Sequence, residues 1–154
     1  MTYTSVLNNE NIITEWDYLQ NYSSDITYYN IDRWDNYFGW IIDYAQSSQS
    51  PYIDTDVSVD NKNYKYRVSY ADECGNEGPE SGSNIGKNII LKGIQHKGYF
   101  ELTWNSYGNW NAGIDRHIIQ HYHQAANTYN NIATVSSTTL QYSNIEYAVD
   151  IDTN

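Results

Sequence analysis

The chain has 154 residues and a net charge of −11 at pH 7, with 19 Asp and Glu against 8 Lys and Arg. This excess of negative charge repels nucleic acid and anionic membranes, so neither is expected as a partner. The sequence has no run of 18 apolar residues, which predicts no membrane insertion. Its first residues also lack the basic start and the apolar stretch of a signal peptide.

Aromatic residues are frequent and unevenly chosen: 17 Tyr and 5 Trp, but only 2 Phe. Tyr, Trp, Thr, Val and Ile favour strands, whereas the helix formers Lys, Glu, Ala and Leu are scarce. Asn, Ser, Asp and Gly fill the intervening segments as turn formers. The composition therefore predicts an all-β protein.

Alternation of apolar and polar residues predicts short strands separated by turn signals such as Asn36–Gly39. The clearest strand is Tyr64–Tyr70, where Tyr64, Tyr66 and Val68 share one face and are expected in the core. Short strands at this spacing indicate a β-sandwich. In chain order the strands expected in the first half are Thr2–Val6, Ile12–Trp16, Ile26–Trp34, Trp40–Ala45, Tyr52–Thr55, Tyr64–Tyr70 and Asn84–Leu91.

The second half of the chain repeats the first. Trp16 recurs as Trp104, 88 positions later, with similar neighbours. Further matches occur at offsets of 88 to 90 residues: Tyr29–Trp34 as His117–Tyr122, Tyr52 as Tyr142, and Val59-Asp60 as Val149-Asp150. A repeat of about 90 residues is long enough for each copy to be a domain.

The repeat predicts a first domain over residues 1–92 and a second over residues 93–154, with Lys92-Gly93 at the boundary. The second copy stops where the strand corresponding to Tyr64–Tyr70 should begin. Either the chain is a fragment of a longer protein, or a neighbouring molecule supplies the missing strands.

These patterns resemble the fibronectin type III domain, a seven-stranded sandwich related to immunoglobulin folds, over nearly the whole chain. The family's buried second-strand tryptophan is matched by Trp16 and Trp104, and its Tyr-x-Ile-x-Arg third strand by residues 29–33. Its Tyr-x-Tyr-Arg-Val sixth strand is matched by residues 64–68, with Tyr64 at the family's tyrosine corner. The resemblance implies tandem fibronectin type III sandwiches, with a core on Trp16, Trp104, Tyr64, Tyr66 and Val68.

A narrower resemblance is to the domains of large secreted surface proteins of gliding Bacteroidota. It rests on Tyr-Arg-Val followed by Asp72–Glu77 and Ser81, then on Leu102–Asn105 and Trp110. It implies an extracellular or cell-surface protein that acts in adhesion or in a filament. Domains of that kind often have a cysteine in the sixth strand of the next copy, a possible partner for Cys74, the single cysteine of this chain.

Two sets of residues are candidate metal ligands. His117, His121 and His123 fall on one face of a strand and could share zinc or copper, although three surface histidines are the simpler interpretation. Where the family pattern expects Tyr and Arg, the second copy has His117 and His121. The acidic turns could collect Ca²⁺, but solvated carboxylates explain them better: Asp54, Asp56, Asp60, Glu146, Asp150 and Asp152. No cofactor is therefore expected.

No catalytic arrangement is recognisable, because no nucleophile-elbow context is present and carboxylate pairs carry no information in so acidic a chain. The sequence predicts no enzyme. Surplus aromatic residues are better functional candidates, since exposed Tyr and Trp make flat, stiff contacts with proteins and sugar rings. Those expected in loops or at strand ends are Tyr18, Tyr22, Tyr37, Trp40, Tyr107 and Trp110.

Two functions, and a passive spacer as a third, follow from these features. The first is a structural or adhesive module of a filament or large surface protein, whose partners are other copies of itself or neighbouring domains. A strand from the next subunit would complete the second copy and, repeated head to tail, give a filament. The second is a carbohydrate-binding or spacer module of a secreted polysaccharide-degrading enzyme, with glycans as partners.

Overall fold

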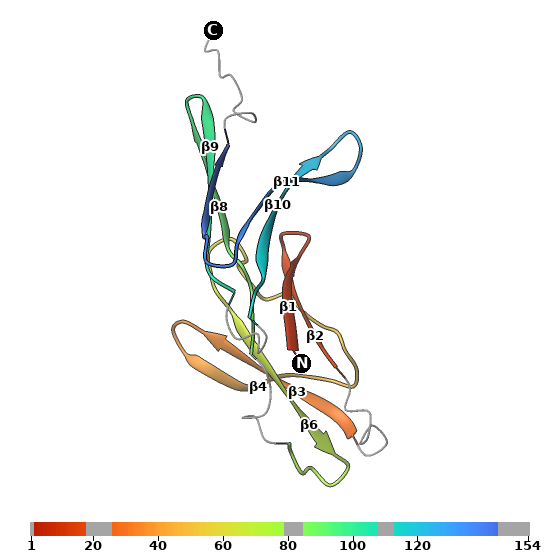
Figure 1. The fold of residues 1–154 in the computed structure, drawn as a ribbon. Coiled ribbons are helices and arrows are strands. Elements are labelled where there is room, and N and C mark those ends of the chain that lie inside the picture. Colours follow the sequence, from red (N-terminus) through yellow and green to blue (C-terminus); the bar gives the residue numbers. More distant parts are fainter. Residues whose placement is uncertain (1, 18–25, 79–84, 108–112, 145–154) are drawn as a thin grey trace. The chain divides into compact units, whose positions relative to one another are not determined.

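A computed structural model describes residues 2–17, 26–78, 85–107 and 113–144. These residues form strands and turns and no helix (Figure 1), which confirms the predicted all-β class. The chain divides into two compact units, Met1–Ile90 with Tyr107–Asn111, and Leu91–Ser106 with Ala112–Asn154.

The first unit is a sandwich of two antiparallel sheets. Its strands are β1 (Thr2–Leu7), β2 (Asn11–Trp16), β3 (Ile26–Asp35), β4 (Gly39–Ser47), β5 (Tyr52–Asp54), β6 (Lys65–Asp72) and β7 (Gly86–Lys87). One sheet has the order β1-β2-β5 and the other the order β4-β3-β6-β7. This arrangement of three strands against four is the one that the fibronectin type III resemblance implies.

The core of the first unit receives alternate residues from both sheets. The buried cluster consists of Ile12, Trp16, Tyr29, Ile31, Val59, Tyr64 and Tyr66, and Val68 packs against it while partly buried. The rings of Trp16 and Tyr29 lie 5.1 Å apart and join β2 of one sheet to β3 of the other. Each large apolar side chain buried in this way stabilises the fold by roughly 1.5–3 kcal/mol.

The predicted last strand of the first copy, Asn84–Leu91, is wrong in length. Among the described residues of this segment, 85–91, only Gly86 and Lys87 pair with β6, because the side chain of the next residue, Asn88, forms hydrogen bonds in place of a continuing strand. Its Oδ1 accepts the backbone N–H of Tyr64 at 2.7 Å and its Nδ2 donates to the carbonyl of Lys62 at 3.1 Å. A side chain that satisfies backbone groups in this way ends the strand.

The second unit contains five strands in the part that the structure describes: β8 (Leu91–His96), β9 (Tyr99–Trp104), β10 (Arg116–His123), β11 (Thr128–Ser136) and β12 (Gln141–Asn144). They form a sheet of order β12-β9-β8 and a two-stranded sheet of β10 and β11. β8 includes Lys92-Gly93, where the sequence predicts the domain boundary.

The internal repeat extends to the pairing of individual residues. Two pairs in the first unit recur in the second at the sequence offsets of 88 and 90: Thr14 with Tyr52 as Leu102 with Tyr142, and Ile31 with Ala45 as Ile119 with Ala133. The aromatic contact between the sheets recurs as well, since the rings of Trp104 and His117 lie 5.5 Å apart. The two tryptophans therefore occupy equivalent surroundings, and both are buried.

We expect Gly86→Ala to destabilise the first unit. A Cβ at this position would overlap Oγ1 of Thr4 on β1, so β7 and β1 must separate, at a cost of about 1–3 kcal/mol. Urea unfolding followed by tryptophan fluorescence measures the change. Gly93→Ala is the matched control, because its nearest atom, Cδ2 of Leu102, would lie 3.5 Å away; equal midpoints for the two variants would contradict the close approach.

Candidate functional site

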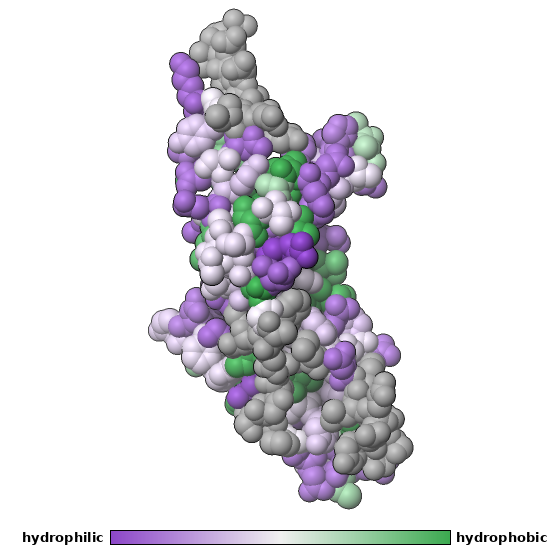
Figure 2. Space-filling model, in the orientation of Figure 1, coloured by the Kyte–Doolittle hydropathy of each residue, from purple (hydrophilic) through white to green (hydrophobic). Residues whose placement is uncertain are grey.

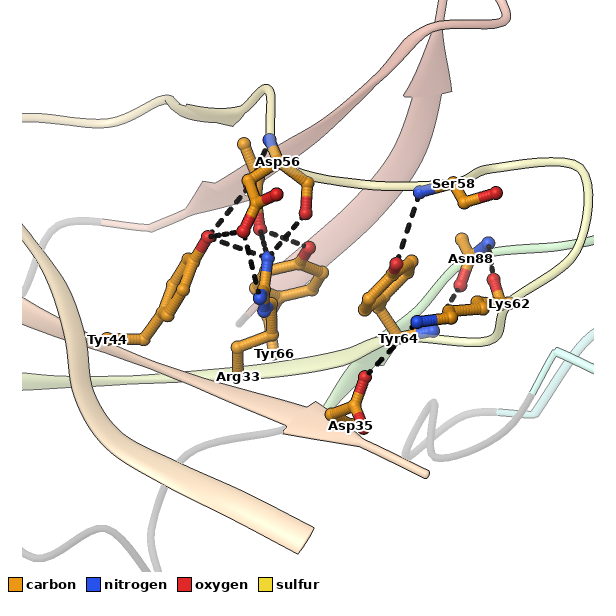
Figure 3. Close-up of polar contacts among 10 residues, drawn as sticks. Arg33, Asp35, Tyr44, Asp56, Ser58, Lys62, Tyr64, Tyr66 and Asn88 are labelled. Atoms are coloured by element: carbon orange, nitrogen blue, oxygen red, sulfur yellow. Dashed lines mark hydrogen bonds and ion pairs between the residues drawn. The ribbon is translucent and has the colours of Figure 1, made fainter. Parts of the chain in front are cut away.

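Arg33 is the centre of a polar cluster in the first unit. Alternation along β3 directs its side chain inward, and the residue is 7% exposed. Its Nη1 donates to the hydroxyl of Tyr44 at 2.6 Å, to Oδ2 of Asp54 at 2.9 Å and to the carbonyl of Asp56 at 2.8 Å (Figure 3). The guanidinium also lies 3.7 Å from the centre of the Tyr44 ring.

Asp54 neutralises this buried cation. It is 1% exposed and stands at the end of β5, in the sheet opposite β3. Its Oδ2 also accepts the hydroxyl of Tyr66 at 2.8 Å, and its Oδ1 accepts that of Tyr44 at 3.3 Å. The ion pair therefore connects the two sheets across the core, with two tyrosine hydroxyls satisfying the remaining lone pairs.

The electrostatics of the cluster favour a fixed charge arrangement. Burial, and then the charge of Asp54, raise the pKa of Tyr66 and of Tyr44 well above the usual range of tyrosine. Burial alone would lower the pKa of Arg33, but its hydrogen bond and its attraction to Asp54 raise it. Both phenols therefore stay protonated and Arg33 stays charged, so these groups are arranged to hold the sheets rather than to exchange protons.

A cavity of about 410 Å³ opens beside this cluster. Its walls come from the turn between β3 and β4, from the segment after β5, and from the start of the segment that leads to β6: Arg33, Asp35, Phe38, Ile41, Thr55, Asp56, Val57, Ser58, Lys62 and Tyr64. Its volume is in the range of small-molecule sites. Lys62 Nζ and Asp35 Oδ2 face each other across it at 4.0 Å (Figure 3).

Asp35 organises the turn at the rim of this cavity. Its Oδ1 accepts the backbone N–H groups of Tyr37 at 2.8 Å and of Phe38 at 3.4 Å, and the bond from Tyr37 is the main reason that the pKa of Asp35 is lowered. Gly39 follows with φ of +76°, which a residue without a side chain adopts freely. The turn presents Tyr37 and Phe38 to solvent, 86% and 74% exposed.

The predicted contact aromatics lie in different surroundings. Tyr37 is on the exposed turn, whereas Trp40 is half-buried on β4, with the guanidinium of Arg67 4.4 Å from its ring. Tyr107 is half-buried, and its hydroxyl donates to the carbonyl of Thr4 at 3.3 Å. Trp110, Tyr18 and Tyr22 lie outside the described residues. Phe38 was missed, although the predicted Asn36–Gly39 turn signals that residues within it are exposed.

Tyr64 has the geometry of a tyrosine corner. Its hydroxyl oxygen accepts the backbone N–H of Ser58, six residues upstream, at 3.1 Å. The family resemblance implies such a bond back to the chain before the sixth strand. It fixes the segment that forms one wall of the cavity.

The candidate metal ligands do not converge in the part of the chain that the structure describes, where no group of three His, Cys, Asp or Glu side chains is close enough to hold an ion. His117 faces Trp104, with its Nε2 3.2 Å from the carbonyl of Ser137, while His121 and His123 are exposed. Asp54 is bound by Arg33. Glu146, Asp150, Asp152 and Val149 lie outside the described residues.

Cys74 is exposed. It lies on a loop whose conformation is fixed by hydrogen bonds to the carboxylate of Asp72. Oδ1 of Asp72 accepts the N–H groups of Cys74 at 2.9 Å and Asn76 at 2.8 Å, and Oδ2 accepts the Asn76 side chain at 2.8 Å. Bonds from Asn76 are the main cause of the lowered pKa of Asp72.

No family model matches the chain, and no curated protein matches it. Several solved structures are similar to the chain, and they include the following two. A Fn3-like protein from Clostridium thermocellum is 18% identical, with a TM-score of 0.46 over 62% of this chain and 93% of that one. The FN1–FN3 domains of chicken CNTN1 are 13% identical, with a TM-score of 0.43 over 93% of this chain and 54% of that one.

Replacement of Asp54 tests whether the Arg33 cluster holds the sheets together. Asp54→Ala leaves the buried guanidinium with only the exposed Asp56 carboxylate, 3.5 Å away, as a counter-ion, so we expect a loss of about 3–5 kcal/mol in the free energy of unfolding. Asp56→Ala is the control, because its carboxylate is 85% exposed and its backbone contact with Arg33 survives; we expect a change below about 1 kcal/mol. Urea titration compares them, and similar losses would refute the cluster's role.

Proposed function

We propose that this chain is a contact and spacer module of an extracellular protein, a filament or a large surface protein, and that its partners are other copies of itself or neighbouring domains of the same protein. The observation that carries the proposal is the recurrence of one sandwich pattern, register included, within a single chain. Tandem sandwiches of this kind extend a chain and multiply weak contacts. The proposal assigns no catalytic activity.

Two further observations support contact as the mode of action. The polar groups at the centre of the first unit are engaged with one another. Hydrophobic patches lie among hydrophilic residues on the surface (Figure 2), and exposed apolar side chains occur in both units, among them Phe38, Ile42, Leu91, Ile94, Ile118 and Tyr129. Exposed apolar side chains that gather in a patch are suited to contact with a partner. No helix in the described part of the chain has the length and apolar character needed to cross a bilayer.

The edge of β10 is the contact surface that we propose for a partner strand. In the first unit β3 pairs with β4 on one side and with β6 on the other. β10, its counterpart, pairs only with β11 among the described residues. A strand edge with no second strand beside it presents N–H and C=O groups that a strand of the β6 pattern satisfies.

A peptide with the sequence of residues 64–72 tests this surface. We expect it to bind the chain and to slow amide hydrogen exchange in β10, because the new ladder protects N–H groups that are otherwise open to water. A peptide of scrambled order is the control. Analytical ultracentrifugation of the chain alone measures self-association in parallel. A chain that stays monomeric at every concentration, and whose β10 gains no protection from the peptide, would refute the proposed function.

One observation favours glycan contact as a second candidate. Tyr37 and Phe38 project from the rim of a cavity that also presents charged and hydroxyl groups, and sugar rings stack on exposed aromatic rings. If the module binds a polysaccharide there, Tyr37→Ala and Phe38→Ala should each weaken retention in affinity electrophoresis at least about tenfold, while Tyr129→Ala, a change at another exposed ring in the second unit, should not. A glycan array without a hit would remove this candidate.

A further inference from the structure

The outer face of the β4-β3-β6-β7 sheet has a row of four residues, one from each strand. Trp40 pairs with Trp34, Trp34 with Lys65, and Lys65 with Lys87. Residues paired directly across strands project from the same side of a sheet, so two indoles and two ammonium groups follow one another across all four strands.

The row holds cationic groups in fixed positions. The two indoles meet edge to face at 5.7 Å. Nζ of Lys65 lies 5.0 Å from the centre of the Trp34 ring, a cation–π arrangement that orders an otherwise flexible side chain. Three of the eight Lys and Arg residues of the chain, Lys65, Lys87 and the neighbouring Arg67, gather on this face.

Lys65 and Lys87 face each other as like charges. Like charges directly opposite on neighbouring strands are destabilising, and burial together with Lys65 lowers the pKa of Lys87. Among the described residues no ion pair joins either lysine to a carboxylate. The next row differs, because Nε of Arg67 is bound to Oδ2 of Asp32 at 2.7 Å. The lysine pair therefore remains a local site for an external anion in a chain of net charge −11.

The opposite end of the same face has a carboxylate, that of Glu77. Glu77 is exposed, and its Oε1 accepts Nδ2 of Asn30 at 2.6 Å, which holds the carboxylate over the row formed by Asn30 and Ser69. Glu73 is exposed on the loop that follows β6. Lys65 and Ser69 are four residues apart on β6, so the cationic row and the acidic end are separated by about 13 Å.

We propose that the outer face of this sheet binds the same face of a second copy of the chain. A two-fold axis that lies in the plane of contact and runs across the strands places Lys65 and Lys87 of each copy opposite Glu77 of the other and the adjoining loop that contains Glu73. The neutral Asp32–Arg67 pair then lies near the axis. This inference rests on the proposed function and names one contact through which copies that repel each other overall still meet.

The size of the face sets the expected strength. Four strands about 4.8 Å apart and about 13 Å of strand length give a face on the order of 200–300 Å², far below the ~800 Å² per partner of a stable interface. Association of isolated chains is therefore weak and depends on salt, and repetition of the module along a larger assembly strengthens it.

Sedimentation at low and high salt tests the proposal with matched charge variants. We expect the wild type to self-associate in 50 mM NaCl and at least about tenfold less in 500 mM NaCl. Lys65→Glu with Lys87→Glu should lower the association constant at least about tenfold. Lys92→Glu with Lys97→Glu, the same charge change in the second unit, should have a much smaller effect.

Charge reversal at both ends distinguishes the two-fold contact from a general effect of charge. Glu73→Lys with Glu77→Lys should also abolish self-association, and a mixture of this variant with Lys65→Glu/Lys87→Glu should associate again. Circular dichroism checks that each variant is folded, and Glu73→Lys alone replaces the double change if the loss of the Asn30 bond unfolds the loop.

Three results would overturn the inference. The first is that Lys92→Glu with Lys97→Glu weakens self-association as much as Lys65→Glu with Lys87→Glu does. The second is that a mixture of the two charge-reversed variants does not associate again. The third is that the chain binds alginate through Lys65 and Lys87 while its self-association does not require them. The last would assign the face to an acidic polysaccharide. The peptide of residues 64–72 could still protect β10 in a chain whose self-association does not depend on these charges. That result would support the proposed function and refute only this contact.

Discussion

Each unit depends on one aromatic contact between its sheets. Trp16 meets Tyr29 at 5.1 Å in the first unit, and Trp104 meets His117 at 5.5 Å in the second. An indole spans most of the distance between two packed sheets, so this contact sets their separation and the face on which every other inward side chain must lie. The pairing register that both units share is the arrangement that brings these rings together.

Much of the fold could be predicted from the sequence because strand periodicity is local information. The alternation of Tyr64–Tyr70 identified β6 and its inward face, and the spacing of the two tryptophans revealed the repeat. The last strand could not be predicted in length, because it ends through the side chain of Asn88, which bonds to residues more than 20 positions away. The pattern of apolar and polar residues in that segment does not predict such a bond.

The candidate sites were less predictable because they depend on register. The sequence predicts the strand that contains Arg33, but only the pairing of β5 with β2 shows that Asp54 is its counter-ion. Tyr37 was singled out as a contact residue and lies exposed, whereas Tyr107 is engaged by Thr4, 103 positions away. A row such as that of Trp34 and Lys65 is invisible until four strands are aligned.

The register that the two units share over part of their strands has a consequence for folding. Hairpins that pair in the same way are interchangeable in geometry, so a nascent chain could join β3 to a strand of the neighbouring repeat and become trapped in a misassembled state. Divergence between equivalent positions counters this hazard: Asn30, buried and bonded to Gln46, corresponds to Ile118, which is 53% exposed. An exchanged pairing would expose the amide contact of Asn30 or bury Ile118 against it, so dissimilar side chains at equivalent positions disfavour exchange between the repeats.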